Sequence, residues 1–280
     1  MPELPEVETV CRGLAKVLPG RSIRAVKLHR DGMRFPFPPA LGKLAHVKIT
    51  GIDRRAKYIL IRLGNDQTLI VHLGMSGRLV IHDDNNKHAP GKHDHMIIEL
   101  DNGVSIVFND PRRFGLADLA VTKDLEDHKL FAHLGPEPLE KEFSEKYLTD
   151  KLKSKKIAIK LAIMDQQVVV GVGNIYASEA LFQSGIDPRR AANAVKPAEI
   201  KKLVSEIKAV LKKAIKAGGS SLRDYVQTDG ELGYFQHQFS VYDKEGQKCQ
   251  NCTCTIKKTG GVQRITQGAR STFYCPVKQA

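Results

Sequence analysis

The first residues of the chain offer a candidate nucleophile. Initiator methionine is normally removed before a small second residue, so Pro2 would present a free secondary amine. An α-amino group titrates near ~8 and a lysine near ~10.4, so a usable fraction of this amine is neutral at physiological pH. Condensation with an aldehyde-level carbon would give a positively charged iminium, a strong electron sink for elimination. Glu3 stands beside it as a candidate general acid, although a proline at position 2 is common and usually idle.

Four of the five cysteines are clustered near the C-terminus, at Cys249, Cys252, Cys254 and Cys275. In a chain without a secretion signal, such clustering favours metal binding over disulfides. Four thiolates satisfy tetrahedral zinc, but only one residue separates the second cysteine from the third, which is tight for a metal-binding knuckle. A four-ligand zinc site, a three-ligand site and a metal-free hairpin therefore all stay open.

A glycine-rich turn at residues 171–174 lies between two expected helices and could bind an anion. Its two glycines allow a tight turn, and Asn174 is expected to cap the helix that follows. The free N–H groups at the start of that helix would then face outward and bind a phosphate, as in helix–turn–helix elements. A plain glycine-rich turn is the alternative interpretation.

Two further loops combine an apolar side chain with a cation. Residues 72–77 carry Met75, and residues 109–115 carry Arg112 and Phe114. Apolar wedges with a nearby arginine are what a protein inserts into a base stack when it flips a nucleotide. Each loop on its own is more often an ordinary turn.

The elements that must position these residues change in type along the chain. Residues 5–17 repeat apolar side chains at helical spacing, with Pro5 in the first turn and Gly20 just past the end. Short β-branched and aromatic segments follow, separated by Gly, Asn and Asp, and this pattern predicts an antiparallel sandwich or barrel. The expected strands are residues 23–28, 47–52, 58–63, 68–73, 96–100 and 104–108.

A glycine and two prolines at residues 135–138 end this first part, because neither helix nor strand continues through them. Helical patterns follow, and the tail returns to strand-like patterns. We expect helices at residues 143–153, 158–164, 175–183 and 197–216, and strands at 239–242, 262–266 and 272–275. The expected fold is α+β with three parts: a β-sandwich with a flanking helix (1–134), a helical domain (135–242) and a C-terminal hairpin (243–280).

The charge of the chain favours a polyanionic partner. Its 44 Lys and Arg against 31 Asp and Glu give a formal net charge of +13. Each phosphate that a lysine or arginine neutralises releases a counterion, so this surplus favours nucleic acid. No apolar run approaches the roughly 18 residues of a membrane span, and the acidic start is unlike a signal peptide. We expect a cytoplasmic protein without membrane association; a basic protein with no DNA partner is the plain alternative.

Taken together, these motifs resemble those of the bacterial formamidopyrimidine-DNA glycosylases, also called Fpg or MutM proteins. The resemblance is carried by MPELPEVETV at residues 1–10, RRAKY at 54–58, LGMSG at 73–77, DPRRFG at 110–115, DQ at 165–166 with GVGNIYASE at 171–179, GGSSLRDY at 218–225 and RSTFYCP at 270–276. It runs in order from Pro2 to about Pro276, and the ten-residue start makes it highly specific. The fold it implies is a β-sandwich, a helix–two-turn–helix domain and a zinc-finger-like hairpin.

The resemblance also implies a role for each matching residue. Pro2 attacks C1′ of the damaged nucleoside, and Glu3 assists sugar opening and proton transfer. Glu6 organises the site, and Lys57, expected on a strand, reaches the reacting nucleotide. Backbone phosphates are bound by His72, Asn174 and Arg270, with Lys160 as a further candidate. The space left by the flipped base is filled by Met75, Arg112 and Phe114, with the arginine facing the orphaned cytosine. The loop that closes over the extruded base includes Gly218, Gly219, Ser220 and Tyr225.

The implied activity is that of a base-excision-repair glycosylase and AP lyase on double-stranded DNA that carries 8-oxoguanine or formamidopyrimidines. The base leaves, a Schiff base forms with Pro2, and β- and δ-elimination cut the strand. The family implies a structural zinc ion, no small-molecule cofactor and a monomer. Leu4 and the wedge residues favour purine lesions, because the endonuclease VIII-like sister group, which prefers oxidised pyrimidines, usually begins Pro-Glu-Gly-Pro. That sister activity and a non-catalytic damaged-DNA-binding protein are the alternatives; the presence of Pro2, Glu3 and Lys57 favours an enzyme.

The C-terminal cysteines depart from the family pattern. The family usually has two cysteine pairs, the second as Cys-Pro-x-Cys, but here Lys278 stands at the last of these positions. The first cluster has one cysteine more than usual, so Cys254 could replace the missing ligand. The 22 residues between Cys252 and Cys275 also exceed the usual spacing.

Overall fold

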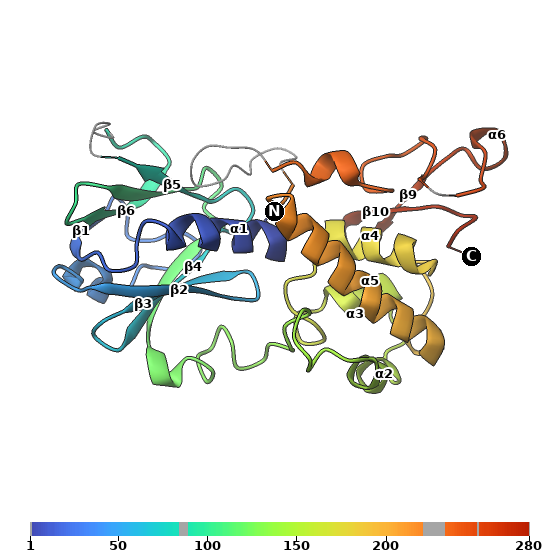
Figure 1. The fold of residues 1–280 in the computed structure, drawn as a ribbon, viewed down its shortest axis with the longest axis horizontal. Helices are drawn as coiled ribbons and strands as arrows, with labels where there is room; N and C mark the ends of the chain where they lie inside the picture. The colour runs from blue at the N-terminus through green and yellow to red at the C-terminus, as the bar shows by residue number, and fades with distance from the viewer. Residues whose placement is uncertain (1, 84–88, 221–232, 251, 280) are drawn as a thin grey trace. The chain divides into compact units, whose positions relative to one another are not determined.

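The structure is a computed structural model that describes residues 2–83, 89–220, 233–250 and 252–279 (Figure 1). The chain divides into two compact units, which are described separately. The first comprises Met1–Ala132 and Ile215–Gln236, and the second comprises His133–Ala214 and His237–Ala280. The segment from 215 to 236 thus returns to the N-terminal unit.

The first unit begins with helix α1 (Leu4–Ala15), whose start is fixed by the acidic residues around it. Glu3 is the N-cap, and the Glu6 side chain accepts a hydrogen bond of 2.9 Å from the Glu3 backbone N–H in a capping box. Pro5 lies in the first turn, where a missing N–H leaves no helical bond unmade. One face of the helix is buried and carries Leu4, Val7, Val10, Cys11 and Leu14.

Two four-stranded antiparallel sheets complete this unit (Figure 1). One has the strand order β1-β6-β7-β5 and the other β2-β3-β4-β8. The strands are β1 (Ile23–Leu28), β2 (Ile49–Arg55), β3 (Tyr58–Leu63), β4 (Gln67–His72), β5 (Arg78–His82), β6 (Asp94–Leu100), β7 (Ser105–Asn109) and β8 (Leu116–Val121). Apolar residues of both sheets and of α1 share one buried cluster. The predicted β-sandwich with a flanking helix is therefore confirmed.

The second unit contains the predicted helices and the predicted hairpin. Its elements are α2 (Glu145–Leu152), α3 (Ile159–Met164), α4 (Asn174–Ser184), α5 (Pro197–Lys216), α6 (Ile256–Thr259), β9 (Gln263–Gln267) and β10 (Arg270–Tyr274). Helix α4 is largely apolar and is buried on nearly all sides. It ends at Gly185, whose φ of 76° is the left-handed conformation that favours glycine. Short 3-10 helices lie at Pro39–Lys43, Thr122–Asp124, Ala192–Ala194 and Phe235–Gln238.

Three local features differ from the sequence-based expectation. Strands β5 and β8 are not predicted, yet each pairs with a neighbouring strand along its whole length. Residues 239–242, expected as a strand, form bends and a turn instead, because the Glu179 carboxylate takes the backbone N–H groups of residues 240–242 that a sheet would use. Asn174 is the first residue of α4, and Gly173 is its N-cap.

Within the residues that the structure describes, no helix has both the length and the apolar character needed to cross a membrane.

Candidate active site

The predicted nucleophile and two glutamates lie together at the start of α1. Pro2 is buried, and Glu3 and Glu6 are 2 % and 1 % exposed. One carboxylate oxygen of Glu6, Oε2, accepts from the Glu3 N–H, and the other, Oε1, accepts from the backbone N–H (2.8 Å) and the hydroxyl (3.0 Å) of Ser220. Gly219 lies against this carboxylate with a φ of 77°, and a Cβ there would be 3.0 Å from Glu6 Oε1.

Glu6 therefore joins the start of the chain to the beginning of the predicted base-recognition loop. The structure brings Glu3, Glu6, Gly219 and Ser220 together. Gly218, the residue before Gly219, has a φ of 74°. Tyr225 lies outside the described residues.

Lys57 lies in the two-residue turn between β2 and β3, and its expected place on a strand is wrong. Ala56 adopts a φ of 54°, which a turn this tight requires. The guanidinium of Arg54 ties the turn to α1, because it donates to the Ala56 carbonyl oxygen (3.0 Å) and to the Glu8 carboxylate (3.0 Å). Lys57 itself is 8 % exposed, so its side chain is largely buried next to this short turn.

His72, at the end of β4, is held in one neutral form. Its Nδ1 accepts a hydrogen bond of 3.0 Å from the Gly74 N–H, so the proton of the neutral ring is on Nε2. Burial, together with the positive charges of Lys57 and Arg34, lowers the pKa of His72 to about 4. The ring is therefore uncharged at physiological pH and offers a single N–H donor.

The predicted wedge residues stand on two adjoining loops. Met75 and Phe114 are exposed, at 38 % and 45 %. The guanidinium carbon of Arg112 lies 4.9 Å from the centre of the Phe114 ring, as in a cation–π pair. The first unit thus presents two apolar side chains and one cation from neighbouring turns.

In the second unit, Lys160 is buried and binds Asn174. Its Nζ donates to Asn174 Oδ1 (2.5 Å), to Thr272 Oγ1 (2.7 Å) and to the Ser271 carbonyl oxygen (3.3 Å). Asn174 Nδ2 donates in turn to the same Ser271 carbonyl oxygen at 2.9 Å. Arg270, at the start of β10, is exposed. The three predicted phosphate-binding residues of this unit are thus connected through the first residues of β10.

Glu179 organises the same unit and is missed by the sequence analysis. Its carboxylate accepts hydrogen bonds of 2.8–2.9 Å from the backbone N–H groups of Ser240, Val241 and Tyr242. It is the only acid in α4, and it is 2 % exposed. A single acid inside an otherwise apolar helix is the signal that could have identified it, because a buried charge needs several donors.

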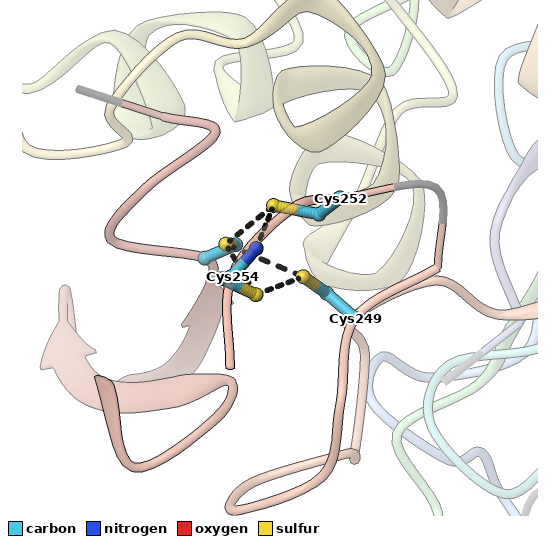
Figure 2. A group of neighbouring side chains, drawn as sticks. Cys249, Cys252 and Cys254 are labelled. Carbon is cyan, nitrogen blue, oxygen red and sulfur yellow. Dashed lines mark hydrogen bonds between the residues drawn. The ribbon is translucent and has the colours of Figure 1, made fainter. Parts of the chain in front are cut away.

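The four C-terminal cysteines converge on one point. Figure 2 labels three of them, Cys249, Cys252 and Cys254. Their Sγ atoms all lie within 4.8 Å of one another. Sulfur–sulfur distances are 2.9 Å for Cys249–Cys254, 3.3 Å for Cys249–Cys275 and 3.6 Å for Cys252–Cys275. Zinc–sulfur bonds of about 2.3 Å in a tetrahedron would place the sulfurs about 3.8 Å apart. The four thiols therefore fit a tetrahedral metal ion, with Cys254 as the fourth ligand.

Two further observations suit this ligand set. Burial opposes ionisation of Cys252, but hydrogen bonds from the Cys254 N–H and from the neighbouring thiols bring the pKa of Cys252 down to about 7. Lys278, at the position where the family usually has a cysteine, places its Nζ 4.1 Å from the centre of the Phe182 ring. Its side chain is thus used for packing on α4.

Two family models match this chain. The one described as the formamidopyrimidine-DNA glycosylase N-terminal domain matches residues 1–117, and the one described as the formamidopyrimidine-DNA glycosylase H2TH domain matches residues 134–226. Curated proteins named formamidopyrimidine-DNA glycosylase are similar along their whole length. That of Rhodospirillum rubrum is 49 % identical, with all of both chains covered, and that of Ruegeria pomeroyi is 49 % identical, with 98 % of each covered.

Solved structures agree with these matches. A Lactococcus lactis Fpg mutant in complex with Fapy-dG containing DNA is 34 % identical, with 99 % of each chain covered and a TM-score of 0.90. The MutM (Fpg) protein of Thermus thermophilus is 35 % identical, with 99 % of this chain and 98 % of that one covered and a TM-score of 0.87. Matches over more than half of the chain, together with relatives at nearly half identity, establish that this chain belongs to the formamidopyrimidine-DNA glycosylase family.

Proposed function

We propose that this protein excises oxidised purines, 8-oxoguanine and formamidopyrimidines, from double-stranded DNA and then cuts the strand as an AP lyase. Relatives of 49 % identity carry the glycosylase name, and neighbouring structures were solved with Fapy-dG or abasic-site DNA. The observation that carries the proposal is the start of α1, where Pro2, Glu3 and Glu6 are buried together next to Ser220. The net charge of +13 suits a DNA partner.

The chemistry follows from a free Pro2 amine. Its nitrogen attacks C1′, the bond from C1′ to the base breaks, and the base leaves with a proton. Glu3 supplies a proton as the sugar ring opens, and the nitrogen becomes an iminium. The iminium withdraws electrons, a C2′ proton is lost, and the bond to the 3′ phosphate breaks. A second elimination breaks the bond to the 5′ phosphate and leaves a one-nucleotide gap with phosphate ends, and water then hydrolyses the iminium and releases the unsaturated sugar fragment from Pro2.

The other side chains of the first unit bind and deform the DNA in this proposal. The Nε2–H of the neutral His72 ring donates to a backbone phosphate, and Lys57 binds the reacting nucleotide from its rigid turn. The wedge (Met75, Arg112 and Phe114) enters the base stack and occupies the place of the flipped base. The loop that receives the base begins with Gly218, Gly219 and Ser220 and includes Tyr225. Glu6 holds the start of this loop through Ser220.

In the second unit, Asn174 and Arg270 bind backbone phosphates. Lys160 has a supporting role, since its ammonium group is buried and donates to Asn174, Thr272 and Ser271. Cys249, Cys252, Cys254 and Cys275 would hold one zinc ion, which supplies a structural cross-link and takes no part in the reaction. This cross-link would hold the C-terminal end of β10, the strand that begins with Arg270.

Borohydride trapping on a duplex with one 8-oxoguanine opposite cytosine tests the proposal. The expected result is a covalent protein–DNA product with the lesion and none with undamaged duplex, with the DNA attached to the N-terminal peptide in mass spectra. A matched protein with extra residues fused before Pro2 keeps every side chain but lacks the free proline amine, and it should give no product. Binding without any trapped product, in a protein whose mass shows that Met1 is removed, would refute the enzyme and favour a damage-binding protein.

A further inference from the structure

Asp110 is a buried carboxylate at the base of the two wedge loops. It directly follows β7 and is 0 % exposed. We call residues 73–77 the Met75 loop and residues 110–115 the Arg112 loop. The Met75 loop lies against Asp110, and the Arg112 loop begins with Asp110. The sequence analysis assigns it no role, although it stands within the Asp-Pro-Arg-Arg-Phe-Gly segment.

The carboxylate of Asp110 joins both loops through short hydrogen bonds. Its Oδ1 accepts from the hydroxyl of Ser76 at 2.6 Å and from the Arg112 backbone N–H at 3.2 Å. Its Oδ2 accepts from the Gly115 backbone N–H at 2.8 Å. The Ser76 Oγ also accepts from the Arg112 N–H at 3.3 Å. One side chain thus fixes the residue after Met75 and both ends of the segment that carries Arg112 and Phe114.

The two loops also touch directly through their backbones. Gly74 has a φ of 64°, and a Cβ there would lie 2.4 Å from the Phe114 carbonyl carbon and 2.5 Å from the Gly115 nitrogen. No side chain fits in that space, so the contact depends on glycine. The exposed tips, Met75 and Phe114, therefore stand on one closely packed base.

The backbone of Asp110 is held by β6, the strand next to β7 in the same sheet, and by the residue before β6. His95, on β6 and 1 % exposed, donates from Nε2 to the Asp110 carbonyl oxygen at 2.8 Å. The Asp110 N–H donates to the His93 carbonyl oxygen at 2.9 Å. The carboxylate is thereby anchored to the rigid sandwich, and the loops are anchored to the carboxylate.

We propose that Asp110 is a positioning residue that locks the Met75 loop and the Arg112 loop into one rigid wedge. The proposal rests on the proposed base-flipping function, in which Met75, Arg112 and Phe114 must enter a base stack together. A wedge that yields when pushed into stacked bases cannot hold them apart, and an arginine on a loose loop cannot discriminate the opposite base. Asp110 touches no DNA in this role and acts only through the residues it binds.

The variant Asp110→Asn tests this with little change of shape. An amide places its NH2 group where one carboxylate oxygen was, so the backbone N–H of either Arg112 or Gly115 meets a donor instead of an acceptor. Ser76→Ala is the milder variant, because it removes one donor and leaves the other two hydrogen bonds. Asp53→Asn is the control, since Asp53 lies on β2 with 56 % of its side chain exposed.

The first readout is the fluorescence of 2-aminopurine placed next to a tetrahydrofuran abasic analogue in a duplex. Saturating wild-type protein and Asp53→Asn should give the full rise in fluorescence as the bases unstack. Asp110→Asn should give less than a third of that rise, with Ser76→Ala between them. The second readout is excision of 8-oxoguanine opposite cytosine relative to adenine, and the ratio should fall towards one in Asp110→Asn.

Trapping on a single-stranded oligonucleotide with a natural abasic site separates the wedge from the chemistry, because a single strand has no base stack to open. Asp110→Asn should retain this trapping within about twofold. A full fluorescence rise and an unchanged base ratio in Asp110→Asn would overturn the proposal while leaving the proposed function intact. A wild-type protein that neither traps nor unstacks would refute the proposed function, and the role of Asp110 would fall with it.

A double-mutant cycle guards against a general loss of folding. Met75→Ala removes one tip of the wedge, and its effect on the fluorescence rise should shrink in the Asp110→Asn background, because the two changes impair the same element. Independent effects of the two changes would contradict the proposal. If Asp110→Asn does not fold, the same cycle with Ser76→Ala decides between these outcomes.

Discussion

Lys160 and Asn174 are joined by a hydrogen bond of 2.5 Å, and the lysine that donates it is fully buried. The same ammonium group binds Thr272 and Ser271 at the start of β10. A lysine so enclosed would support the proposed phosphate site only through its neighbours, because its ammonium group donates to groups within the protein.

Lys160→Met should therefore weaken DNA binding without removing an ionic contact. The change removes the donor to Asn174 Oδ1 and to Thr272 Oγ1, while the Ser271 carbonyl oxygen keeps its bond from Asn174 Nδ2. We expect about 1–3 kcal/mol of lost stability together with several-fold weaker binding. The slope of log K against log salt should stay the same. A lysine in direct contact with a phosphate would instead lower that slope by about 0.9, and this result would refute the supporting role. Lys201→Met, at an exposed position of α5, is the control.

His72 should make the protein less stable in acid. The pKa of His72 is about 4 in the folded protein and 6.5 in the unfolded chain, so the unfolded chain binds the proton more tightly. The contribution of neutral His72 to the free energy of unfolding is complete above pH 6.5 and is lost as the pH falls towards 4. Between pH 7 and pH 4.5 the wild type should lose roughly 2–3 kcal/mol more than His72→Gln in urea unfolding. An equal loss in both proteins would show that His72 is not the group responsible.

Cys254 should behave as the fourth metal ligand. Native mass spectrometry of the purified protein should show one zinc ion, and Cys254→Ser should weaken zinc binding by more than the roughly 10–100-fold typical of outer-shell changes. The double variant Cys254→Ser with Lys278→Cys should regain zinc, because it restores the ligand pattern usual in the family. Tight zinc binding by Cys254→Ser alone would mean that three cysteines are sufficient.

Glu179→Gln should destabilise the second unit. The carboxylate accepts hydrogen bonds from three backbone N–H groups through its two oxygens. The amide has only one oxygen to accept with, so its NH2 group faces at least one of these N–H donors. We expect a loss of about 1–3 kcal/mol in urea unfolding, which differential scanning calorimetry should report as a lower midpoint. The control Glu245→Gln, at a side chain that is 57 % exposed, should change little, and equal effects of the two variants would contradict this assignment.

Periodic patterns predicted α1, α5 and most strands of the sandwich, because those elements bury one continuous apolar face. The same patterns failed at residues 239–242, where a single carboxylate on α4 replaces the partner strand. The turn at Lys57 was also not predicted as such, since the left-handed Ala56 has no signature in a residue type that rarely adopts that conformation. Local sequence carries no information about a partner that lies more than fifty residues away.

Resemblance to a family identified the residues that are expected to meet DNA, but not the ones that hold them. Met75, Arg112 and Phe114 stand in recognisable motifs, whereas the role of Asp110 depends on Ser76, which is 34 residues away in the chain. Likewise, the resemblance offered Lys160 as a further candidate for phosphate binding, but the contacts of its ammonium group are on β10, more than a hundred residues later. Such supports become visible only when the fold places distant segments together.

The arrangement of the cysteines changes what a bound metal would do mechanically. Three of the four thiols come from a stretch of six residues, and only Cys275 lies on the far side of the hairpin, 21 residues from Cys254. A metal held in this way would act as a single staple that closes one loop, with a stabilisation of about 3 kcal/mol on the scale of a cross-linked chain of that length. Loss of the metal would release one end of the hairpin while its strand pairing persists. The end of β10 next to Cys275 would thus loosen first, while Arg270, at the turn of the hairpin, stays paired with Gln267.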